Sequence, residues 1–407
     1  MLRIGYFLAG AQQGLNGGGT GPYATRILEN LLRSSSGLQF HIFVAPHQVE
    51  YVRRLGQQFP QRHLTWSIIH IVRPLAFLLR PLAELGVAKR IRLARQIAQL
   101  LNYVEWQVRR YRVDVLYSPV QILPTTSWRT PTIITMHDIQ ELHYPEFFTP
   151  YERALRANLH WWALESATNV VVSFDHVKAD LVRYFRLPPE KIHVCPIPIT
   201  NDWLPSATPS DAVSARYKLA GDVLLYPAQT WPHKNHLGLI KALAILRDTD
   251  QLTPTLVCTG KTNAHFSQIE AEIERLGLQS QVRFLGMVSD EDLAGLYRIA
   301  RCVVVPTLYE AGSFPVIEAI LLGAPIICSR VTSLPETIGD PAFTFDANDP
   351  TDIAGAIRLM LTDQQHFARN LYNAELRRQV FATTPRVSAD AFEQLYMLAA
   401  GAKRCRS

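Results

Sequence analysis

Short apolar runs alternate with amphipathic helical stretches along almost the whole chain of 407 residues, and this alternation constrains the fold more than any other feature. An apolar run bounded by helical stretches suits a strand that is buried on both faces, and a parallel sheet covered by helices on both faces provides that environment. The pattern therefore predicts an α/β protein built from doubly wound parallel sheets.

The alternation occurs twice, on either side of a proline-bearing segment, PIPITNDWLPSATPSD, which has the character of an interdomain linker. The first series predicts strands at Leu2–Ala9, Phe40–Val44, Trp66–Ile71, Val113–Tyr117, Thr132–Met136, Asn169–Ser173 and Ile192–Cys195. The second predicts strands at Val223–Pro227, Thr255–Thr259, Val282–Leu285, Cys302–Pro306, Pro325–Ser329 and Ala342–Phe345. We therefore expect two Rossmann-like domains, residues 1–200 and 201–385, and a last helix that begins after Pro385, over residues 386–407.

Composition excludes several classes of protein. A hydrophobic content of 48% with 19% charged residues is ordinary for a globular chain. The five cysteines are widely separated and lack metal-ligand spacing, which favours a reduced, cytoplasmic protein. No stretch reaches the ~18 apolar residues that a membrane span needs. The start, MLRIGYFLAGA, leads into a glycine-rich turn and not to a cleavage site, so we interpret it as a strand and not as a signal peptide.

The positive charge of the chain is concentrated between residues 73 and 112, where nine basic residues face two acidic ones, against a net charge of +6 for the whole chain. A basic amphipathic helix there could lie on an anionic membrane surface, and an ordinary surface helix packed by its leucines is the alternative. The basic character does not extend to a recognisable nucleic-acid-reading motif, so we expect no nucleic acid partner.

Four motifs fall just after strands, and ligands of doubly wound sheets bind beyond the carboxyl ends of their strands. These motifs are Gly17–Tyr23, His137–Asp138, Gln229–Asn235 and Glu310–Glu318.

The glycine-rich loop, LNGGGTGPYATRIL, imitates a dinucleotide fingerprint. About seven residues separate it from the strand, however, and the second strand ends without an acid for a ribose. The loop either faces an anion or a sugar through its backbone N–H groups or is a plain tight turn.

Histidine and lysine side chains mark the next two motifs. His137 follows an apolar strand, where an imidazole can donate to a sugar hydroxyl or a phosphate, or simply cap the strand. Lys234 stands at the entrance of a helix, where an ammonium adds to the positive helix end and suits phosphate. A solvated lysine is the alternative.

The fourth motif, YEAGSFPVIEAILLGAPII, places two carboxylates around a turn that opens an apolar helix, expected at Phe314–Leu322. Glu310 lies in the turn and Glu318 lies in the helix, so both can reach one cavity. Carboxylates accept hydrogen bonds from pairs of hydroxyls, and the N–H groups of Gly312–Phe314 suit a diphosphate or a sugar oxygen. Compensation of the helix dipole explains Glu318 more easily than Glu310.

These four elements, in this order, resemble the retaining glycosyltransferases of family 4, which have the GT-B fold of two Rossmann-like domains facing a central cleft. The resemblance covers most of the chain and is strongest from Val223 to Leu361, in strings such as "VRFLGMVSDEDLAGLYRIA" and "VPTLYEAGSFPVIEAILLGAPIICS". It implies that the first domain binds the acceptor, the second binds a nucleotide sugar, and the last helix crosses back to the first domain.

The resemblance also implies roles for single residues. Glu310 would contact hydroxyls of the donor sugar and Glu318 the ribose, while Lys234 would neutralise the diphosphate. The remaining donor-binding positions are Gly18, Gly19, Gln229, Gly286, Met287, Val288, Ala311, Gly312, Ser313 and Phe314. His137 would face the transferred sugar, so that His137, Lys234 and Glu310 form the expected catalytic set.

One position departs from the family pattern. Members commonly have an arginine five residues before the lysine, and this chain has Gln229, which supplies no charge. Stabilisation of the leaving group would then rest on Lys234 and the helix terminus, with His233 or Arg330 as further candidates.

We expect no metal and no other cofactor. The triplets Asp248–Asp250 and Asp290–Asp292 have the D-x-D spacing that binds manganese in another glycosyltransferase fold. The first ends a helix, however, and the second follows Ser289 as a capping cluster.

The expected activity is retaining transfer of a hexosyl unit (mannose, glucose or N-acetylglucosamine) from a GDP- or UDP-sugar to a glycan or lipid-linked acceptor, in synthesis of a cell-envelope polysaccharide or glycolipid. Such an enzyme would be cytoplasmic, with peripheral contact to the inner face of the membrane through residues 73–112. The alternatives are a noncatalytic nucleotide-sugar-binding subunit and a GT-B epimerase or phosphorylase.

Overall fold

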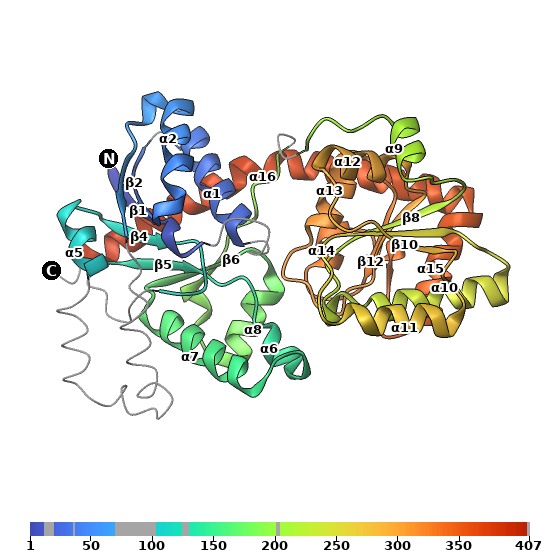
Figure 1. Ribbon diagram of the computed structural model, residues 1–407. Helices are drawn as coiled ribbons and strands as arrows, with labels where there is room; N and C mark the ends of the chain where they lie inside the picture. Colours follow the sequence, from blue (N-terminus) through green and yellow to red (C-terminus); the bar gives the residue numbers. More distant parts are fainter. Residues whose placement is uncertain (12–19, 36, 70–102, 124–129, 201–203, 405–407) are drawn as a thin grey trace. The chain divides into compact units, whose positions relative to one another are not determined.

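The computed structural model describes residues 1–11, 20–35, 37–69, 103–123, 130–200 and 204–404 (Figure 1). The chain forms two compact units, one made of residues 1–198 and 384–407 and the other of residues 199–383. Within the described ranges, no helix combines the length and the apolar character needed to cross a bilayer.

The first unit contains a parallel sheet in the order β3-β2-β1-β4-β5-β6-β7. Its strands are β1 Leu2–Phe7, β2 Leu38–Val44, β3 Thr65–Ile68, β4 Val115–Ser118, β5 Thr132–Thr135, β6 Asn169–Val172 and β7 Ile192–Val194. The strand order reverses between β1 and β4, which is where doubly wound sheets bind ligands. Its described helices are α1 Thr20–Ser34, α2 Val49–Gln58, α5 Tyr103–Arg110, α6 Gln140–His143, α7 Pro150–Ser166 and α8 Asp175–Phe185.

The second unit contains a parallel sheet in the order β10-β9-β8-β11-β12-β13. Its strands are β8 Val223–Pro227, β9 Thr255–Thr259, β10 Val282–Phe284, β11 Cys302–Val305, β12 Ile326–Ser329 and β13 Thr344–Phe345. Its helices are α9 Ser210–Arg216, α10 His236–Asp250, α11 Phe266–Leu276, α12 Asp290–Ile299, α13 Phe314–Leu322, α14 Leu334–Ile338 and α15 Pro350–Thr362. The reversal of strand order lies between β8 and β11, so the loops after these two strands are placed to bind a ligand.

The expected fold class is confirmed, and the strands differ from expectation mainly at their ends. Leu8–Gly10 forms a 3-10 turn where the first strand was expected to continue, and Pro341–Phe343 forms a 3-10 turn before β13. A proline fixes the backbone near helical φ, which explains the second difference.

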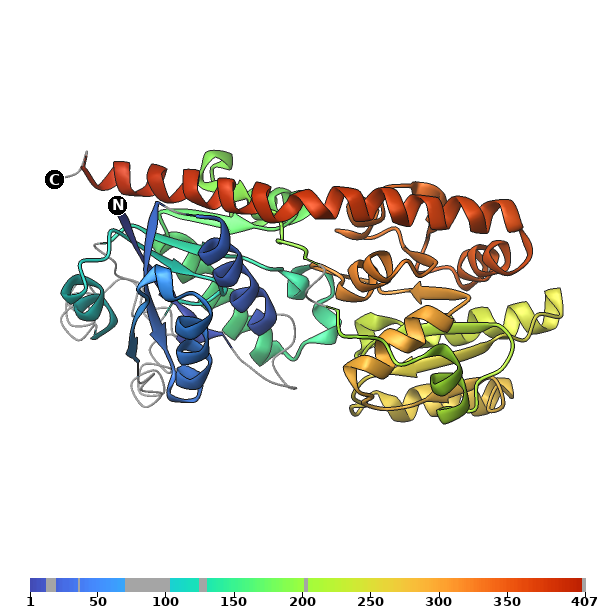
Figure 2. The same cartoon turned by 90° about the horizontal axis from the view of Figure 1, so that it is seen from above.

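Helix α16, Gln364–Arg404, is drawn as one long helix in Figure 2. It corrects the expectation that the last helix begins after Pro385, because the proline lies inside it. A proline inside a helix removes one backbone hydrogen bond, and packing on both sides of it can outweigh that loss. Before the proline, the Asn370 side chain pairs with both backbone groups of Ile326, at 2.9 and 2.8 Å. After it, the Pro385 carbonyl accepts a hydrogen bond from Asn30 Nδ2 at 2.8 Å.

The last turns of α16 belong to the core of the first unit. Phe392 is fully buried and packs edge-on against Tyr117 of β4, with ring centroids 5.2 Å apart. Tyr396 and Ala399 are also fully buried in the same cluster as Tyr6 and Ile27. The hydrophobic core of the first unit is therefore completed by a segment far away in the sequence.

We predict that Phe392→Ala lowers the free energy of unfolding by about 3–5 kcal/mol, because it leaves a cavity against Tyr117. Urea denaturation followed by intrinsic fluorescence measures this change. Leu398→Ala, whose side chain is 56% exposed on the same helix, is the matched control and should change stability by less than about 0.5 kcal/mol. Equal effects of the two substitutions would contradict this packing of α16.

Candidate functional site

Asn235 ties together the loops that follow the strands of the second sheet. It has a left-handed backbone (φ 57°), which asparagine tolerates better than most residues, and it caps α10 by accepting a hydrogen bond from the N–H of Gly238 at 3.2 Å. Its amide nitrogen donates to the carbonyls of Pro306 and Ala347, at 3.0 and 2.8 Å. The loops after β8, β11 and β13 are thereby fixed around the residue that precedes Asn235, which is Lys234.

Lys234 and Glu310 form a buried ion pair. The ammonium Nζ lies 2.7 Å from Glu310 Oε2, and the two side chains are only 18% and 10% exposed. The Lys234 carbonyl accepts a hydrogen bond from the hydroxyl of buried Tyr226 at 2.7 Å. Two residues that the sequence analysis expected to contact different parts of a ligand are thus in direct contact, although 76 positions separate them.

The backbone of Glu310 is held by hydroxyl groups from the loop after β12. Thr332 Oγ1 donates to the Glu310 carbonyl at 2.6 Å and accepts from the Glu310 N–H at 3.2 Å, while Ser333 Oγ also donates to this carbonyl at 3.2 Å. Neither residue was predicted from the sequence, because a Ser or Thr in a loop carries no distinctive signal. They fix the carboxylate opposite Lys234.

Helix α13 begins at Phe314 and ends before Gly323, as expected, and its N-terminus presents polar groups beside Glu310. The first N–H groups of a helix have no acceptor within the helix. Ser313, the N-cap residue, is only 1% exposed, and its hydroxyl has no hydrogen-bond partner among the described residues. Ala311 and Gly312 are half-buried in the same loop. A buried hydroxyl beside a helix N-terminus suits a polar, anionic ligand.

Glu318 lies one turn into α13 and is held by a buried tyrosine. Its Oε2 accepts a hydrogen bond from the Tyr297 hydroxyl at 2.9 Å. Burial and the neighbouring Glu318 charge raise the pKa of Tyr297 well above its usual range, so the phenol remains a donor. The carboxylate orientation is therefore set from α12.

Gln229 and the two residues considered as substitutes for the missing arginine, His233 and Arg330, differ in charge. Gln229 Oε1 accepts a hydrogen bond from Trp231 Nε1 at 3.0 Å. Burial, followed by the charge of Lys234, lowers the pKa of His233 to about 3, so its ring is neutral at pH 7. The Arg330 guanidinium donates to Thr344 Oγ1 at 3.2 Å. A neutral His233 cannot replace the charge that an arginine would supply at position 229.

Three further donor-site candidates follow β10. The Gly286 carbonyl accepts a hydrogen bond from the N–H of Gly260 at 2.8 Å, and its φ of 67° favours glycine. Met287 is 59% exposed and Val288 is half-buried. These residues lie at the same edge of the sheet as the loop after β9.

In the first unit, His137 emerges from the carboxyl end of β5. Its Nε2 lies 3.0 Å from the carbonyl of Pro119, and its ring meets Tyr23 edge-on with centroids 4.6 Å apart. Because a carbonyl only accepts hydrogen bonds, Nε2 carries the proton. Burial lowers the pKa of His137, which favours the neutral ring and leaves Nδ1 as an acceptor. A ligand hydroxyl could donate to Nδ1.

Two sets of predicted residues lie wholly or partly outside the described residues. Gly18 and Gly19 belong to the first set. The second is the basic segment 73–112, of which only residues 103–112 are described, mostly as helix α5.

Three aspartates of the two D-x-D triplets, Asp248, Asp250 and Asp292, have basic or hydroxyl partners. Asp248 pairs with Arg247 and Asp250 pairs with Arg358, at 2.7 and 3.1 Å. Asp292 accepts hydrogen bonds from Thr208, Arg216 and Tyr217. No group of three or more potential metal-binding side chains occurs in the described part of the chain.

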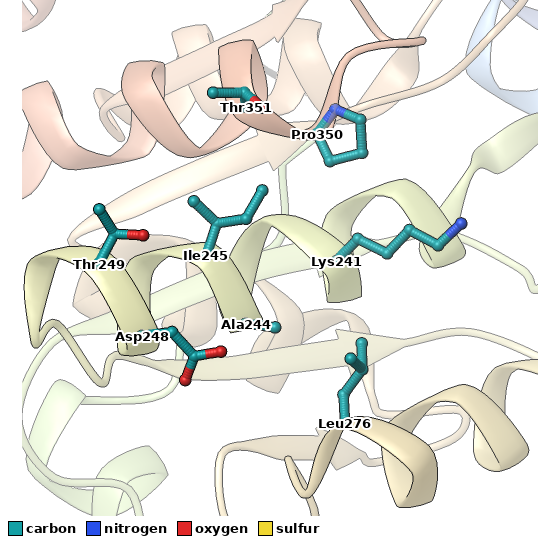
Figure 3. Close-up of a pocket in the computed structure, with 8 residues that line it drawn as sticks. All are labelled: Lys241, Ala244, Ile245, Asp248, Thr249, Leu276, Pro350 and Thr351. Atoms are coloured by element: carbon teal, nitrogen blue, oxygen red, sulfur yellow. The ribbon is translucent and has the colours of Figure 1, made fainter.

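A surface hollow of about 470 Å³ lies on the helical face of the second unit (Figure 3). Its lining residues are Lys241, Ala244, Ile245, Asp248, Thr249, Leu276, Pro350 and Thr351. They come mainly from the flanks of α10 and α15, and none was predicted as a site residue. We assign no ligand to this hollow.

We predict that Lys234→Met lowers the free energy of unfolding by about 3 kcal/mol, because the buried Glu310 carboxylate loses its partner. Adding Glu310→Gln in the same chain should restore most of the loss. Urea denaturation of the two single variants and the double variant measures the coupling, with exposed Lys241→Met as the control. Additive losses would contradict the ion pair.

A second prediction concerns pH. Burial, followed by the charge of Lys234, lowers the pKa of His236 to about 3, against about 6.5 in an unfolded chain. Below pH 6.5 the unfolded state binds a proton that the folded state does not, so stability falls as the pH drops from 6.5 towards 3. Between pH 6.5 and 5 the wild type should lose about 1–2 kcal/mol more than His236→Gln. If the free energy of unfolding changed equally with pH in the wild type and in His236→Gln, the lowered pKa of His236 would be contradicted.

Two family models match the chain, "Glycosyl transferases group 1" over residues 215–377 and "Glycosyltransferase Family 4" over residues 17–202. The O-antigen chain mannosyltransferase B of Escherichia coli is 32% identical over 263 residues, which are 63% of this chain and 68% of that protein. A D-inositol 3-phosphate glycosyltransferase of Corynebacterium glutamicum (strain R) is 26% identical over 251 residues, which are 58% of this chain and 60% of that protein.

The fold is also similar to that of solved structures. The crystal structure of Anabaena Alr3699/HepE, in complex with UDP and glucose, matches 97% of this chain and 99% of that chain with a TM-score of 0.68 and 18% identity. Sequence and fold agree: this chain is a glycosyltransferase and belongs to family 4, with the GT-B fold.

Proposed function

We propose that this glycosyltransferase moves a hexosyl unit from a nucleotide diphosphate sugar to a glycan or lipid-linked acceptor, in the synthesis of a cell-envelope polysaccharide or glycolipid. Mannose from GDP-mannose is the first candidate, because the relatives include an O-antigen chain mannosyltransferase. UDP-glucose is the second, because the similar Anabaena protein was solved with UDP and glucose. The observation that carries the proposal is the buried Lys234–Glu310 pair beside the N-terminus of α13.

This arrangement complements a sugar diphosphate group by group. On donor binding, the Lys234 ammonium turns from Glu310 to the diphosphate, and the released carboxylate accepts hydrogen bonds from sugar hydroxyls. The N–H groups at the start of α13 and the hydroxyl of Ser313 add donors for the phosphate or sugar oxygens. Without donor, the ion pair keeps two buried charges satisfied.

The reaction needs the bond between the sugar C1 and the diphosphate oxygen to break. Lys234 and the positive end of α13 stabilise the negative charge that develops on the departing diphosphate, so no metal is required by this scheme. We propose retention of configuration. The acceptor hydroxyl attacks C1 on the face from which the diphosphate leaves, and its proton passes to a diphosphate oxygen. Neutral His137 accepts a hydrogen bond from a hydroxyl of the transferred sugar through Nδ1.

Gln229 supports one competing proposal, a noncatalytic nucleotide-sugar-binding subunit. Its amide oxygen bonds to Trp231, and it adds no charge for a leaving group. A Gln229→Arg variant that gained transfer absent from the wild type would support this alternative.

We place the working enzyme in the cytoplasm at the inner face of the membrane, where the basic segment 73–112 meets anionic lipid. Salt-sensitive binding to anionic vesicles tests that placement.

A thermal-shift screen against UDP-, GDP- and ADP-sugars tests the function. The true donor at 100 times its dissociation constant should stabilise the folded state by about 2.7 kcal/mol. Glu310→Gln, which keeps the size of the side chain, should weaken binding of the nucleotide sugar much more than binding of the free nucleotide, and should lower transfer by about 100-fold or more. Unchanged turnover in this variant would refute the assigned role.

A further inference from the structure

Asp138 directly follows His137, and its carboxylate is held on one side only. Oδ1 accepts hydrogen bonds from Arg156 Nη2 at 2.8 Å and from the backbone N–H of Gln140 at 3.3 Å. The main-chain carbonyl of Asp138 accepts another from Gln121 Nε2 at 2.7 Å. In the described part of the chain no group donates to Oδ2, and the side chain is 24% exposed. The residue is fixed, yet one of its oxygens remains open.

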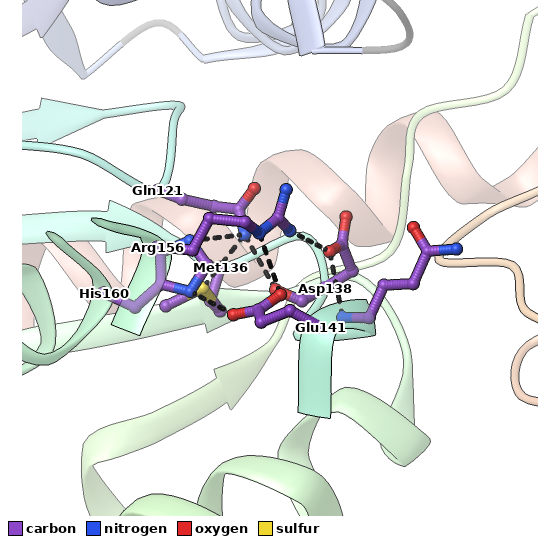
Figure 4. A network of polar contacts seen from close by, with 7 residues as sticks. Gln121, Met136, Asp138, Glu141, Arg156 and His160 are labelled. Carbon is purple, nitrogen blue, oxygen red and sulfur yellow. Dashed lines mark hydrogen bonds and ion pairs between the residues drawn. The ribbon is translucent and has the colours of Figure 1, made fainter. Parts of the chain in front are cut away.

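Arg156 is fixed by a second carboxylate. Its Nε donates to Glu141 Oε2 at 2.9 Å, and its guanidinium lies 5.1 Å from the centre of the Phe148 ring. The planar guanidinium therefore bridges two acids in one orientation, which a lysine ammonium cannot reproduce. Figure 4 shows Arg156 between Glu141 and Asp138.

The contacts close into a ring under the loop that carries His137. Glu141 Oε1 lies 3.0 Å from His160 Nδ1, and His160 Nε2 lies 3.4 Å from Gln121 Nε2. Gln121 then leads back to the Asp138 carbonyl. Glu141 and His160 are 2% and 4% exposed, so this part of the ring is rigid. We call these five residues, Gln121, Asp138, Glu141, Arg156 and His160, the polar ring.

The ionisation of Glu141 and the contacts of Arg156 help to decide which ligand group Asp138 Oδ2 can bind. Burial opposes ionisation of Glu141, but His160 and Arg156 together lower its pKa below the usual value, so Glu141 is ionised at pH 7. One guanidinium then faces two carboxylates. Within the described residues no group donates to Asp138 Oδ2, and a carboxylate oxygen accepts hydrogen bonds and repels phosphate.

We propose that Asp138 binds a hydroxyl group of the acceptor through Oδ2, and that Arg156 is the residue that positions it. The inference rests on the proposed function and on the resemblance to family 4, which implies that the first domain binds the acceptor. Arg156 acts only through Asp138 and touches no substrate. The polar ring thus serves as a rigid support for one hydrogen bond to a sugar-like acceptor.

The test compares two reactions of the same donor, transfer of the sugar to the acceptor and hydrolysis by water. Radiolabelled donor, chosen by the thermal-shift screen, is offered with a membrane extract of the producing organism, which holds the native acceptor. Label transferred to the extract and label released by water are both measured. Asp138→Ala and Asp138→Asn should lower transfer about 10- to 100-fold, while hydrolysis and donor affinity change less than about twofold. The ratio of transfer to hydrolysis is independent of the folded fraction, so a merely structural role would not move it.

Arg156 variants test the positioning role. Arg156→Ala should lower the ratio about 5- to 10-fold, and Arg156→Lys should recover part of it, since one ammonium can meet only one carboxylate. In the Asp138→Ala background, Arg156→Ala should have almost no further effect, because both substitutions remove the same contact. Arg153→Ala, exposed on the same helix and outside the polar ring, is the control and should change the ratio less than twofold.

The outcomes separate this inference from the proposed function. A wild-type ratio in both Asp138 variants would overturn the inference and leave the transferase assignment intact. Multiplicative losses in the double variant would overturn the positioning role of Arg156. A wild type that neither binds nor hydrolyses any nucleotide sugar would overturn the proposed function itself.

Discussion

The ion pair between Lys234 and Glu310 organises the second unit. The two charged side chains are largely buried among loops, so each needs the other until a ligand arrives. Much of the surrounding structure serves this contact: Asn235 fixes the loop that carries the lysine, and Thr332 holds the backbone of the acid. A ligand that carries both a diphosphate and hydroxyl groups can replace the ion pair, because the diphosphate can pair with Lys234 and the hydroxyls can donate hydrogen bonds to Glu310.

The two units use their sheet edges in different ways. In the second unit a cation, a helix N-terminus and carboxylates meet at one edge, which suits a charged ligand. In the first unit the described groups beyond β5 are a neutral imidazole and an acid held by Arg156, which suits hydroxyl groups. Both sheets have the same parallel architecture, so the architecture does not explain the difference. The difference comes from the side chains beyond the strand ends, some of which have partners within the protein while others are left to contact a ligand.

The sequence predicted the fold well because the alternation of apolar runs reports strand burial directly. The helix Phe314–Leu322 was predicted to the residue, since Ser313 and Gly323 mark its ends. Contacts between distant parts of the chain were not predictable: nothing near Glu318 indicates Tyr297, and nothing near Asp138 indicates Arg156. Lys234 and Glu310 were both predicted as site residues, but the ion pair between them was not, because it depends on the geometry of two loops that no local sequence pattern determines. The start of the last helix was wrongly predicted to follow Pro385, because packing at Asn30 and Phe392 outweighs the local effect of the proline.

The core of the first unit combines strands from early in the chain with side chains of the last helix, and this has a consequence for biosynthesis. Phe392, Tyr396 and Ala399 fill the space against Tyr6 and Tyr117. On the ribosome, the strands of this sheet emerge before these side chains and must wait for them until residues 199–383 have been translated. The nascent N-terminal sheet therefore exposes an apolar face throughout elongation, which makes it a substrate for chaperones, while residues 199–383 can already have reached their final packing.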